Sequence, residues 1–229
     1  MPRAGLTPSI VVAEAARLAD DVGFDALTLA ALAARFGVAV PSLYKHVDGL
    51  EAVRRGVSIL ALRELGTAMA EELRSSIDHG GPNGTDGASS PDITSRPGSA
   101  KGQGGAGGQP GEAPLRALAR AYRAYARAHP GRYAATLRAA PAGDVEYAAA
   151  GDAIIGTAYG VLGARGLVGD DAIDATRAVR AALHGFVTLE AAGGFGLPRD
   201  VDRSFERLVE ALDLGLAALG TDAQGPAAG

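Results

Sequence analysis

Apolar side chains recur every three or four residues along most of the chain, which is the spacing of one face of an α-helix. Before residue 57 this pattern predicts three short helices. The first runs from a Thr7-Pro8 start to a Gly23 stop, and its predicted buried face consists of Ile10, Ala13, Leu18 and Val22. The second lies between Thr28 and Gly37, with a predicted buried stripe of Leu29, Leu32, Ala33 and Phe36. The third covers about residues 40–46.

A longer helix is predicted over about residues 48–77. Asp48 and Glu51 stand three residues apart at its start and predict a capping box. Its apolar face consists of Leu50, Val53, Val57, Leu60 and Leu65. Residues 57–78 are therefore predicted to be a helix that connects the N-terminal region, residues 1–56, to the rest of the chain.

The helical pattern resumes after residue 114 and predicts five further segments. The first carries Leu115, Leu118, Tyr122 and Tyr125 and is broken at His129-Pro130-Gly131. A short helix with Tyr133 and Leu137 follows, then helices over residues 144–164 and 170–192, and a last helix that begins at Asp202. No convincing strand is found, so the predicted fold class is all-α, with a helical domain over residues 115–220 and a frayed tail over 221–229.

Residues 79–114 differ sharply in composition from both flanks. They contain 11 Gly and 5 Pro, and Ile93 is their one large aliphatic residue. Such a segment buries too little apolar surface to offset the entropy of ordering it, so we predict a flexible linker. Its Gly102-x-Gly104-x-x-Gly107 run lacks the strand and helix that a dinucleotide-binding fingerprint requires, and we interpret it as chance.

Composition narrows the possible chemistry. Hydrophobic residues make up 47% of the chain and aromatic residues 5%, which favours closely packed helices. The absence of cysteine excludes disulfides, thiolate zinc sites and cysteine nucleophiles. The net charge of −4 argues against a general nucleic-acid coat, which is normally basic. With no apolar run long enough to span a bilayer, we expect a cytoplasmic protein.

Three short helices within about 45 residues, the last two joined by Gly37-Val38-Ala39, have the layout of a helix-turn-helix. The first two helices and the start of the fourth would bury a small core. The third would stay short and present its N-terminal turn to the major groove of DNA. The balanced charge of residues 1–56, with six basic and six acidic side chains, neither supports nor opposes this interpretation.

The same residues resemble the DNA-binding signature of TetR/AcrR transcriptional regulators. The most specific part is Gly37-Val38-x-x-Pro41-Ser42-Leu43-Tyr44-x-His46-Val47, within a match that covers residues 7–56. The resemblance implies an all-helical homodimer of about nine helices per chain. It also implies ligand-controlled binding to a palindromic operator in double-stranded DNA, usually as a repressor.

The resemblance further implies which side chains face DNA: Thr28, Ala39, Val40, Pro41, Ser42, Tyr44, Lys45 and His46. Tyr44 and His46 are expected at phosphates, and Val40, Pro41 and Lys45 at base edges, while Leu43 and Val47 point inward. Alternatively, Tyr44 packs against the first helix and His46 caps the third.

This sequence departs from the family pattern at two positions. Ala39 stands where a Ser often precedes the third helix, and an alanine cannot cap a helix. Leu50 stands where a Lys or Arg usually follows the short loop, so a phosphate contact is missing. Lys45, Arg54 and Arg55 are the candidates to replace it.

Residues 115–219 resemble, more loosely, the C-terminal domain of a branch named after its Trp-His-Gly motif, with Leu183 in place of the Trp before His184-Gly185. The resemblance implies a dimer interface on the last two helices, formed by Val179, Leu183, Phe186, Phe205, Leu208, Val209, Leu212 and Leu216. The alternative is that these side chains form only the core of a single chain.

A pocket for a small, mostly hydrophobic effector is expected among the C-terminal helices. Its candidate lining residues are Tyr122, Tyr125, Tyr133, Leu137, Tyr147, Tyr159 and His184. Alternatively, these are ordinary core aromatics. The four histidines have no metal-ligand spacing, and no catalytic motif stands out, so we expect neither a metal, a cofactor nor an enzyme. The competing hypotheses are a helical enzyme or carrier with an incidental helix-turn-helix, and an architectural DNA-binding protein.

Overall fold

The computed structural model describes residues 5–78 and 114–222, which form nine helices and no strand. The helices are α1 (Pro8–Val22), α2 (Leu29–Phe36), α3 (Val40–Leu43), α4 (Leu50–Asp78), α5 (Pro114–Ala128), α6 (Pro130–Ala135), α7 (Val145–Gly163), α8 (Gly169–Ala191) and α9 (Val201–Asp222). The all-α prediction is confirmed. The predicted linker and its glycine run lie outside the described residues, apart from Pro114, and so does the predicted tail from residue 223 on.

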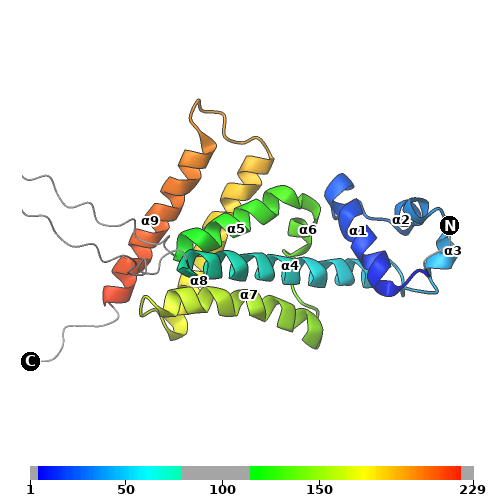
Figure 1. Ribbon diagram of the computed structural model, residues 1–229, viewed down its shortest axis with the longest axis horizontal. Coiled ribbons are helices and arrows are strands. Elements are labelled where there is room, and N and C mark those ends of the chain that lie inside the picture. Colours follow the sequence, from blue (N-terminus) through cyan, green and yellow to red (C-terminus); the bar gives the residue numbers. More distant parts are fainter. Residues whose placement is uncertain (1–4, 79–113, 223–229) are drawn as a thin grey trace, which may run out of the picture.

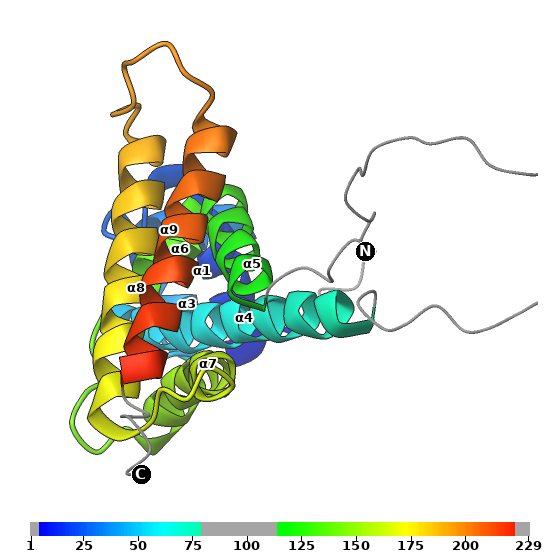
Figure 2. The same ribbon diagram turned by 90° about the vertical axis from the view of Figure 1, so that its left-hand side faces the viewer.

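The helices are arranged along the long helix α4 (Figure 1). At one end of the molecule α1, α2 and α3 form a small group, and α4 runs from this group into the rest of the protein, flanked there by α5 and α7. At the opposite end α8 and α9 lie side by side as a long hairpin (Figure 2). Among the described residues no helix is both long and apolar enough to cross a membrane.

The N-terminal group folds around its own apolar core. The hydroxyl of Thr7 accepts a hydrogen bond from the backbone N–H of Ile10, and that of Thr28 from Ala31, so α1 and α2 begin where the sequence predicts. Gly37 ends α2 in the left-handed conformation. The predicted stripe of α2 is also confirmed, because Leu32 and Ala33 are buried and Leu29 and Phe36 pack against the same core.

The predicted face of α1 is wrong in part: Leu18 is buried as predicted, but the two ends of the face are not. Ile10 and Val22 are 41% and 49% exposed, whereas Val11, Ala15 and Ala19 are buried. The reason is the position of two later helices, which pack on the other stripe of α1. At Gly56 of α4 and Gly131 of α6 there is no side chain to hold these helices away from α1, so they determine which stripe is covered.

The start of α4 also differs from the prediction. The helix begins at Leu50, and Glu51 does not act as a capping-box partner of Asp48. Its carboxylate instead pairs with Arg54 at 3.0 Å and with Arg138 at 3.2 Å, which ties α4 to the segment after α6. The rest of α4 contributes to both halves of the protein: Val53 and Val57 belong to the N-terminal core, and Leu65 and Met69 to the C-terminal core.

The C-terminal core is formed by α4, α5, α7, α8 and α9 together with Tyr133 of α6. Leu115, Leu118, Tyr122 and Tyr125 are buried in α5 as predicted. Helix α6 begins at Pro130, where a missing N–H costs nothing. It ends at Ala135, so the prediction that Leu137 belongs to this helix is wrong, and its side chain is exposed.

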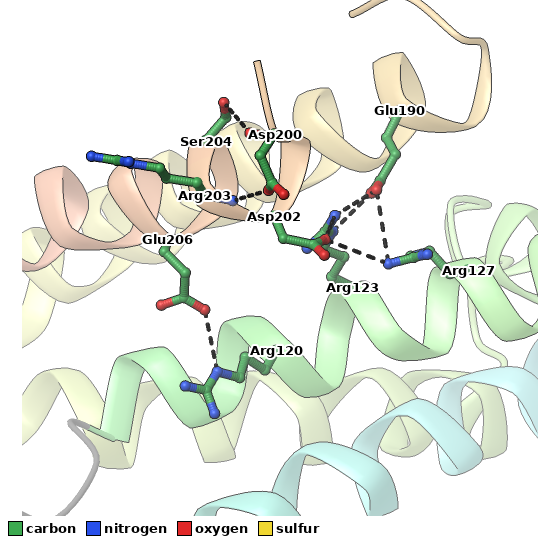
Figure 3. A network of polar contacts seen from close by, with 9 residues as sticks. All are labelled: Arg120, Arg123, Arg127, Glu190, Asp200, Asp202, Arg203, Ser204 and Glu206. Carbon is green, nitrogen blue, oxygen red and sulfur yellow. Dashed lines mark hydrogen bonds and ion pairs between the residues drawn. The ribbon is translucent and has the colours of Figure 1, made fainter. Parts of the chain in front are cut away.

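Arg123 of α5 holds the α8–α9 hairpin against the rest of the domain (Figure 3). This side chain is only 8% exposed, yet it is fully paired. Its guanidinium bonds to both carboxylate oxygens of Glu190, at 2.8 and 2.5 Å, and to Asp202 at 2.7 Å. It also lies 4.7 Å from the ring centroid of Phe205. One buried cation therefore joins the end of α8 and the start of α9 to α5.

Candidate DNA-binding surface and ligand pocket

Helix α3 and the turn after it form the exposed tip of the N-terminal group. Leu43 and Val47 are buried, as predicted, and anchor this segment to the core. The other candidate DNA-facing residues lie outside: Thr28, Ala39, Pro41, Tyr44 and Lys45 are exposed, and Val40, Ser42 and His46 are partly exposed. Tyr44 is 58% exposed, so the alternative that it packs against α1 is wrong.

Helix α3 is shorter than predicted, with four residues, Val40–Leu43, rather than about seven. Ala39 occupies the capping position in extended geometry but makes no side-chain hydrogen bond, as its chemistry dictates. The chain continues as a turn in which the backbone N–H groups of His46 and Val47 bond to the carbonyl of Leu43. The tip is therefore compact, and most of its polar side chains point away from the core.

Most cations of this region are already neutralised. Arg17 pairs with Glu14, and Arg35 pairs with Asp21. Leu50 packs against the N-terminal core and carries no charge. Lys45, Arg54 and Arg55 therefore remain as the candidates for the phosphate contact that Leu50 cannot make.

Two of these candidates, Arg54 and Arg55, are already bound to other groups of the protein. Arg54 bonds to Glu51 and to the backbone carbonyl of Asp25. Arg55 bonds to Asp144 at 2.5 Å and to Glu146 at 3.0 Å, and holds the pKa of both carboxyl groups below their usual values. Within the described part of residues 1–56, Lys45 is the one cation with no carboxylate partner.

A cavity of about 600 Å³ lies in the C-terminal domain, bounded by α4, α5, α7 and α8. Three of the seven candidate pocket residues line it, namely Tyr122, Tyr147 and Tyr159. The remainder of its wall is largely aliphatic, with Leu62, Leu65 and Met69 contributed by α4. The size and the apolar wall suit a small organic molecule.

The other four candidates, Tyr125, Tyr133, Leu137 and His184, do not line the cavity. Leu137 is exposed beyond the end of α6. Tyr133 lies behind the wall, where its hydroxyl shares hydrogen bonds with Tyr122, at 2.8 Å, and with Nδ1 of His184, at 2.7 Å. Burial raises the pKa of Tyr122 and Tyr133, so both stay protonated at neutral pH.

A polar joint between the N-terminal group and the C-terminal domain was not predicted from the sequence. Asp20 of α1 accepts a 2.8 Å hydrogen bond from the backbone N–H of Arg132 and lies 2.9 Å from its guanidinium. Arg132 also bonds to Glu64 of α4 at 3.1 Å, and the hydroxyl of Tyr125 donates to the same carboxylate. These contacts join α1, α4, α5 and α6. Charged residues so far apart along the chain give no local signal of such contacts.

The candidate dimer residues are mostly buried within the single chain. Six of the eight, Val179, Leu183, Phe186, Phe205, Val209 and Leu216, belong to the C-terminal core, and Leu208 and Leu212 pack against it. The burial of these six side chains supports the alternative that they form the core of a single chain, and the position of the dimer interface stays a prediction. The outward stripe of the hairpin consists instead of Ala178, Ala181, Gly185 and Leu189 of α8 and of Ala211, Leu214, Gly215 and Ala218 of α9.

The sequence matches two family models. Residues 11–49 match the family described as bacterial regulatory proteins, tetR family. Residues 115–212 match the family described as tetracyclin repressor-like, C-terminal domain. The first match covers α1, α2, α3 and the loop that leads into α4. The second spans α5 to the middle of α9 and therefore includes most of the cavity wall.

Known proteins resemble the chain over most of its length. An uncharacterised HTH-type transcriptional regulator of Mycobacterium tuberculosis is 34% identical, over 93% of this chain and 83% of that protein. Another from Bacillus subtilis is 30% identical, over 87% of each. The fold is similar to that of the TetR family protein ActR of Streptomyces coelicolor in complex with (S)-DNPA, with a TM-score of 0.56 and 19% identity, over 95% of this chain and all of that one.

Proposed function

The chain belongs to the TetR family of bacterial transcriptional regulators and carries its DNA-binding helix-turn-helix, and from that premise we propose that it is a homodimeric repressor released from its operator by a small, mostly apolar ligand. The observation that carries the proposal is the position of α4. One helix supplies Val53 and Val57 to the core beneath α3, and Leu62, Leu65 and Met69 to the wall of the cavity.

The exposed tip supports the DNA-binding part of the proposal. In the proposed complex, the start of α3 enters the major groove, with Val40, Pro41 and Lys45 at base edges. Thr28, Tyr44 and His46 bond to phosphate oxygens. Ala39 and Ser42 lie close to the backbone of the DNA. This arrangement uses the residues that the chain leaves accessible, and it keeps Leu43 and Val47 in the core.

The outward stripe of the α8–α9 hairpin supports the dimer. Its residues are mostly alanine and glycine, with Leu189 and Leu214 as the large apolar members, and Leu214 is 67% exposed. Small side chains allow helices of two copies to approach closely as a four-helix bundle. The hairpin lies at the opposite end of the molecule from α3, so such a dimer leaves both tips free for DNA (Figures 1 and 2).

The polar joint supplies a route from the pocket to the tip. A ligand that prefers one arrangement of α4 and α7 would move α4, and with it Glu64, relative to Arg132 and Asp20. The tips of the two subunits would then change their separation, which must match half-sites about 34–36 Å apart for binding one turn apart. Only a ligand with different affinities for the two arrangements can do this. ActR was solved with a bound small molecule, which is consistent with such a role for the cavity here.

The test is selection of binding sites from a random DNA pool at one stated salt concentration, followed by a screen for compounds that release the selected site. We expect enrichment of a palindrome by the wild type and none by the double variant Tyr44→Ala/Lys45→Ala. Arg74→Ala, an exposed position near the end of α4 that is remote from the tip and off the outward stripe, is the matched control and should select the same palindrome. A folded wild-type protein that enriches no sequence would contradict the proposal.

A further inference from the structure

Most polar groups on the wall of the cavity already have partners inside the protein. The hydroxyl of Tyr122 is bonded to Tyr133, and that of Thr136 donates to the carbonyl of Tyr133 at 2.7 Å. The hydroxyl of Tyr147 donates to the carbonyl of Arg138, and that of Thr176 to the carbonyl of Ala172. These groups shape the cavity without requiring a ligand. A polar group on the wall that has no partner inside the protein is therefore the best indication of what a ligand must provide.

Arg180 of α8 is such a group. Two other arginines line the cavity, and each has a carboxylate: Arg177 lies 3.5 Å from Asp174, and Arg138 lies 3.2 Å from Glu51. In the part of the chain that the structure describes, Arg180 makes no hydrogen bond and no ion pair. Its charge nevertheless reaches the buried tyrosines behind the wall. Burial raises the pKa of Tyr122 and Tyr133, and the charge of Arg180 opposes that rise.

The other residues that line the cavity determine which charges surround Arg180. Asp152 of α7 is the one acidic residue among the lining residues, against the three arginines. Leucine, isoleucine, valine, alanine and methionine side chains make up most of the remaining wall. A molecule that fills this cavity must be mainly apolar, and among the described lining residues Arg180 is the one cation left for its polar end, because Arg138 and Arg177 already have carboxylate partners.

We propose that the effector is a mostly apolar molecule that ends in a carboxylate, with the carboxylate bound by Arg180. This inference rests on the proposed ligand-binding function and names the ligand class. A guanidinium binds a carboxylate through two parallel hydrogen bonds, a geometry that neither an alcohol nor an amine can use.

The proposed dimer leaves this site accessible. With 100° between successive residues of an α-helix, Ile173, Arg177 and Arg180 share one face of α8. Arg180 itself is separated by about 100° or more around the helix from Ala178, Ala181 and Gly185 of the outward stripe, whereas Arg177 lies only about 40° from Ala181. A second copy packed on the stripe therefore does not cover Arg180, and each subunit of the dimer binds its own ligand.

The test compares three probes with the same chain and different headgroups: decanoate, decanol and decylamine. Binding to the full-length protein is measured by isothermal titration calorimetry without DNA, at low salt. We expect decanoate to bind at least about five-fold more tightly than decanol, because a charge-assisted hydrogen bond is added. The preference should shrink as salt rises, since Arg180 is exposed to solvent at the edge of the cavity. Equal affinity for decanoate and decanol, or no binding of decanoate, would overturn the proposal.

Substitutions of the lining residues test whether Arg180 causes the preference for decanoate. Arg180→Gln should remove the preference for decanoate, and Arg180→Glu should reverse it in favour of decylamine. Asp152→Asn should strengthen decanoate binding by removing the opposing charge. Arg177→Gln is the matched control, because Arg177 lines the same cavity but has its own partner, and it should retain most of the preference. A preference unchanged in Arg180→Glu, with helical content intact by circular dichroism, would refute the role of Arg180.

The outcome is separable from that of the proposed function, because DNA release is a different measurement. If decanoate binds through Arg180 but does not release the selected operator, the ligand class stands and the proposed mode of release is wrong. If the protein selects an operator but decanoate does not bind, the ligand class is wrong and the regulator remains.

Discussion

At the scale of single residues, Lys45 is the side chain on which we expect the electrostatic part of DNA binding to depend. The other described cations of the N-terminal region are paired with carboxylates, and Leu50 lies in the core where a phosphate-binding cation is usual for the family. The salt dependence of binding counts the phosphates that a protein neutralises. A regulator with few free cations depends strongly on each of them.

We therefore predict that Lys45→Ala weakens operator binding by about ten-fold and lowers the slope of log affinity against log salt by about one. The measurement is a titration of the selected operator at several salt concentrations. Arg17→Ala is the control in the same domain, since Arg17 is already paired with Glu14. An unchanged salt slope in Lys45→Ala would mean that this lysine does not contact a phosphate.

Arg123 is the residue on which the position of the α8–α9 hairpin depends. Its removal leaves the carboxylate of Glu190 half-buried without its main partner and takes a cation from the face of Phe205. We expect Arg123→Ala to lower the free energy of unfolding by about 2–4 kcal/mol. Arg127→Ala, an exposed neighbour 4.0 Å from the same carboxylate, should cost less than about 1 kcal/mol. Urea denaturation of both variants makes the comparison, and equal losses would be inconsistent with this role.

The same pair predicts a pH dependence. The hydrogen bonds from Arg123 hold the pKa of Glu190 below its usual value. The stabilisation is therefore complete above the unfolded-state pKa of about 4.3 and is lost as pH falls through the lower, folded-state pKa. Urea denaturation between pH 7 and pH 3 should show that wild type and Glu190→Gln differ most near neutrality. The difference should shrink below about pH 4. A difference that stays constant with pH would show that the charge of Glu190 is not what stabilises the hairpin.

Among the elements, the contact between α1 and α6 is the closest approach that joins the two halves of the protein. A Cβ atom at Gly131 would lie 1.9 Å from the carbonyl oxygen of Ala19 and 2.6 Å from the backbone nitrogen of Asp20. Neither backbone atom can move without shifting its helix. The glycine thus sets the distance at which Asp20 reaches Arg132, and the geometry of the polar joint depends on it.

Gly131→Ala should therefore lower the free energy of unfolding by about 1–3 kcal/mol, because α6 is forced away from α1. It should also weaken the effect of a releasing ligand on operator binding. Gly160→Ala in α7 is the matched control: nothing lies near its Cβ, so it should raise stability by up to about 1 kcal/mol. Thermal unfolding and operator release with the same ligand test both. An equally stable Gly131→Ala protein would show that α1 and α6 are not fixed at this contact.

For the whole molecule, the decisive question is how two copies associate. The hairpin lies at the end opposite to α3 (Figure 1), and the residues of its exposed stripe are mostly small. Stable dimers of this kind bury surface over many such positions, so a single large charge at the centre of the stripe is costly.

We predict that Ala181→Arg or Leu214→Asp converts the proposed dimer to a monomer and abolishes high-affinity binding to a palindrome. Size-exclusion chromatography with light scattering gives the mass directly. Leu197→Asp is the control, since Leu197 is 84% exposed in the loop between α8 and α9 and lies off the stripe. Dimers of unchanged stability in both stripe variants would refute this interface.

The sequence alone determined the elements and the family. Caps such as Thr28, stops such as Gly37 and the spacing of Leu32 and Leu43 act through neighbours within one or two turns, so their effect can be predicted locally. The ordered residues from Gly37 to Val47 likewise predicted the helix-turn-helix. The hydrophobic periodicity could not predict which of two adjacent stripes of α1 is covered by other helices. The reversal between Ile10 and Val11 was decided by α4 and α6, elements far along the chain.

The tertiary structure alone decided which side chains meet. Tyr122, Tyr125 and Tyr133 were equally good candidates for the pocket, but of these three only Tyr122 lines the cavity. Val179 and Phe205 were assigned to a dimer contact but fill the core of one chain. An apolar position has the same signature whether it faces its own chain, a ligand or a second copy. The polar joint of Asp20, Glu64 and Arg132 has no signature at all, because its hydrogen bonds form only after distant helices have packed.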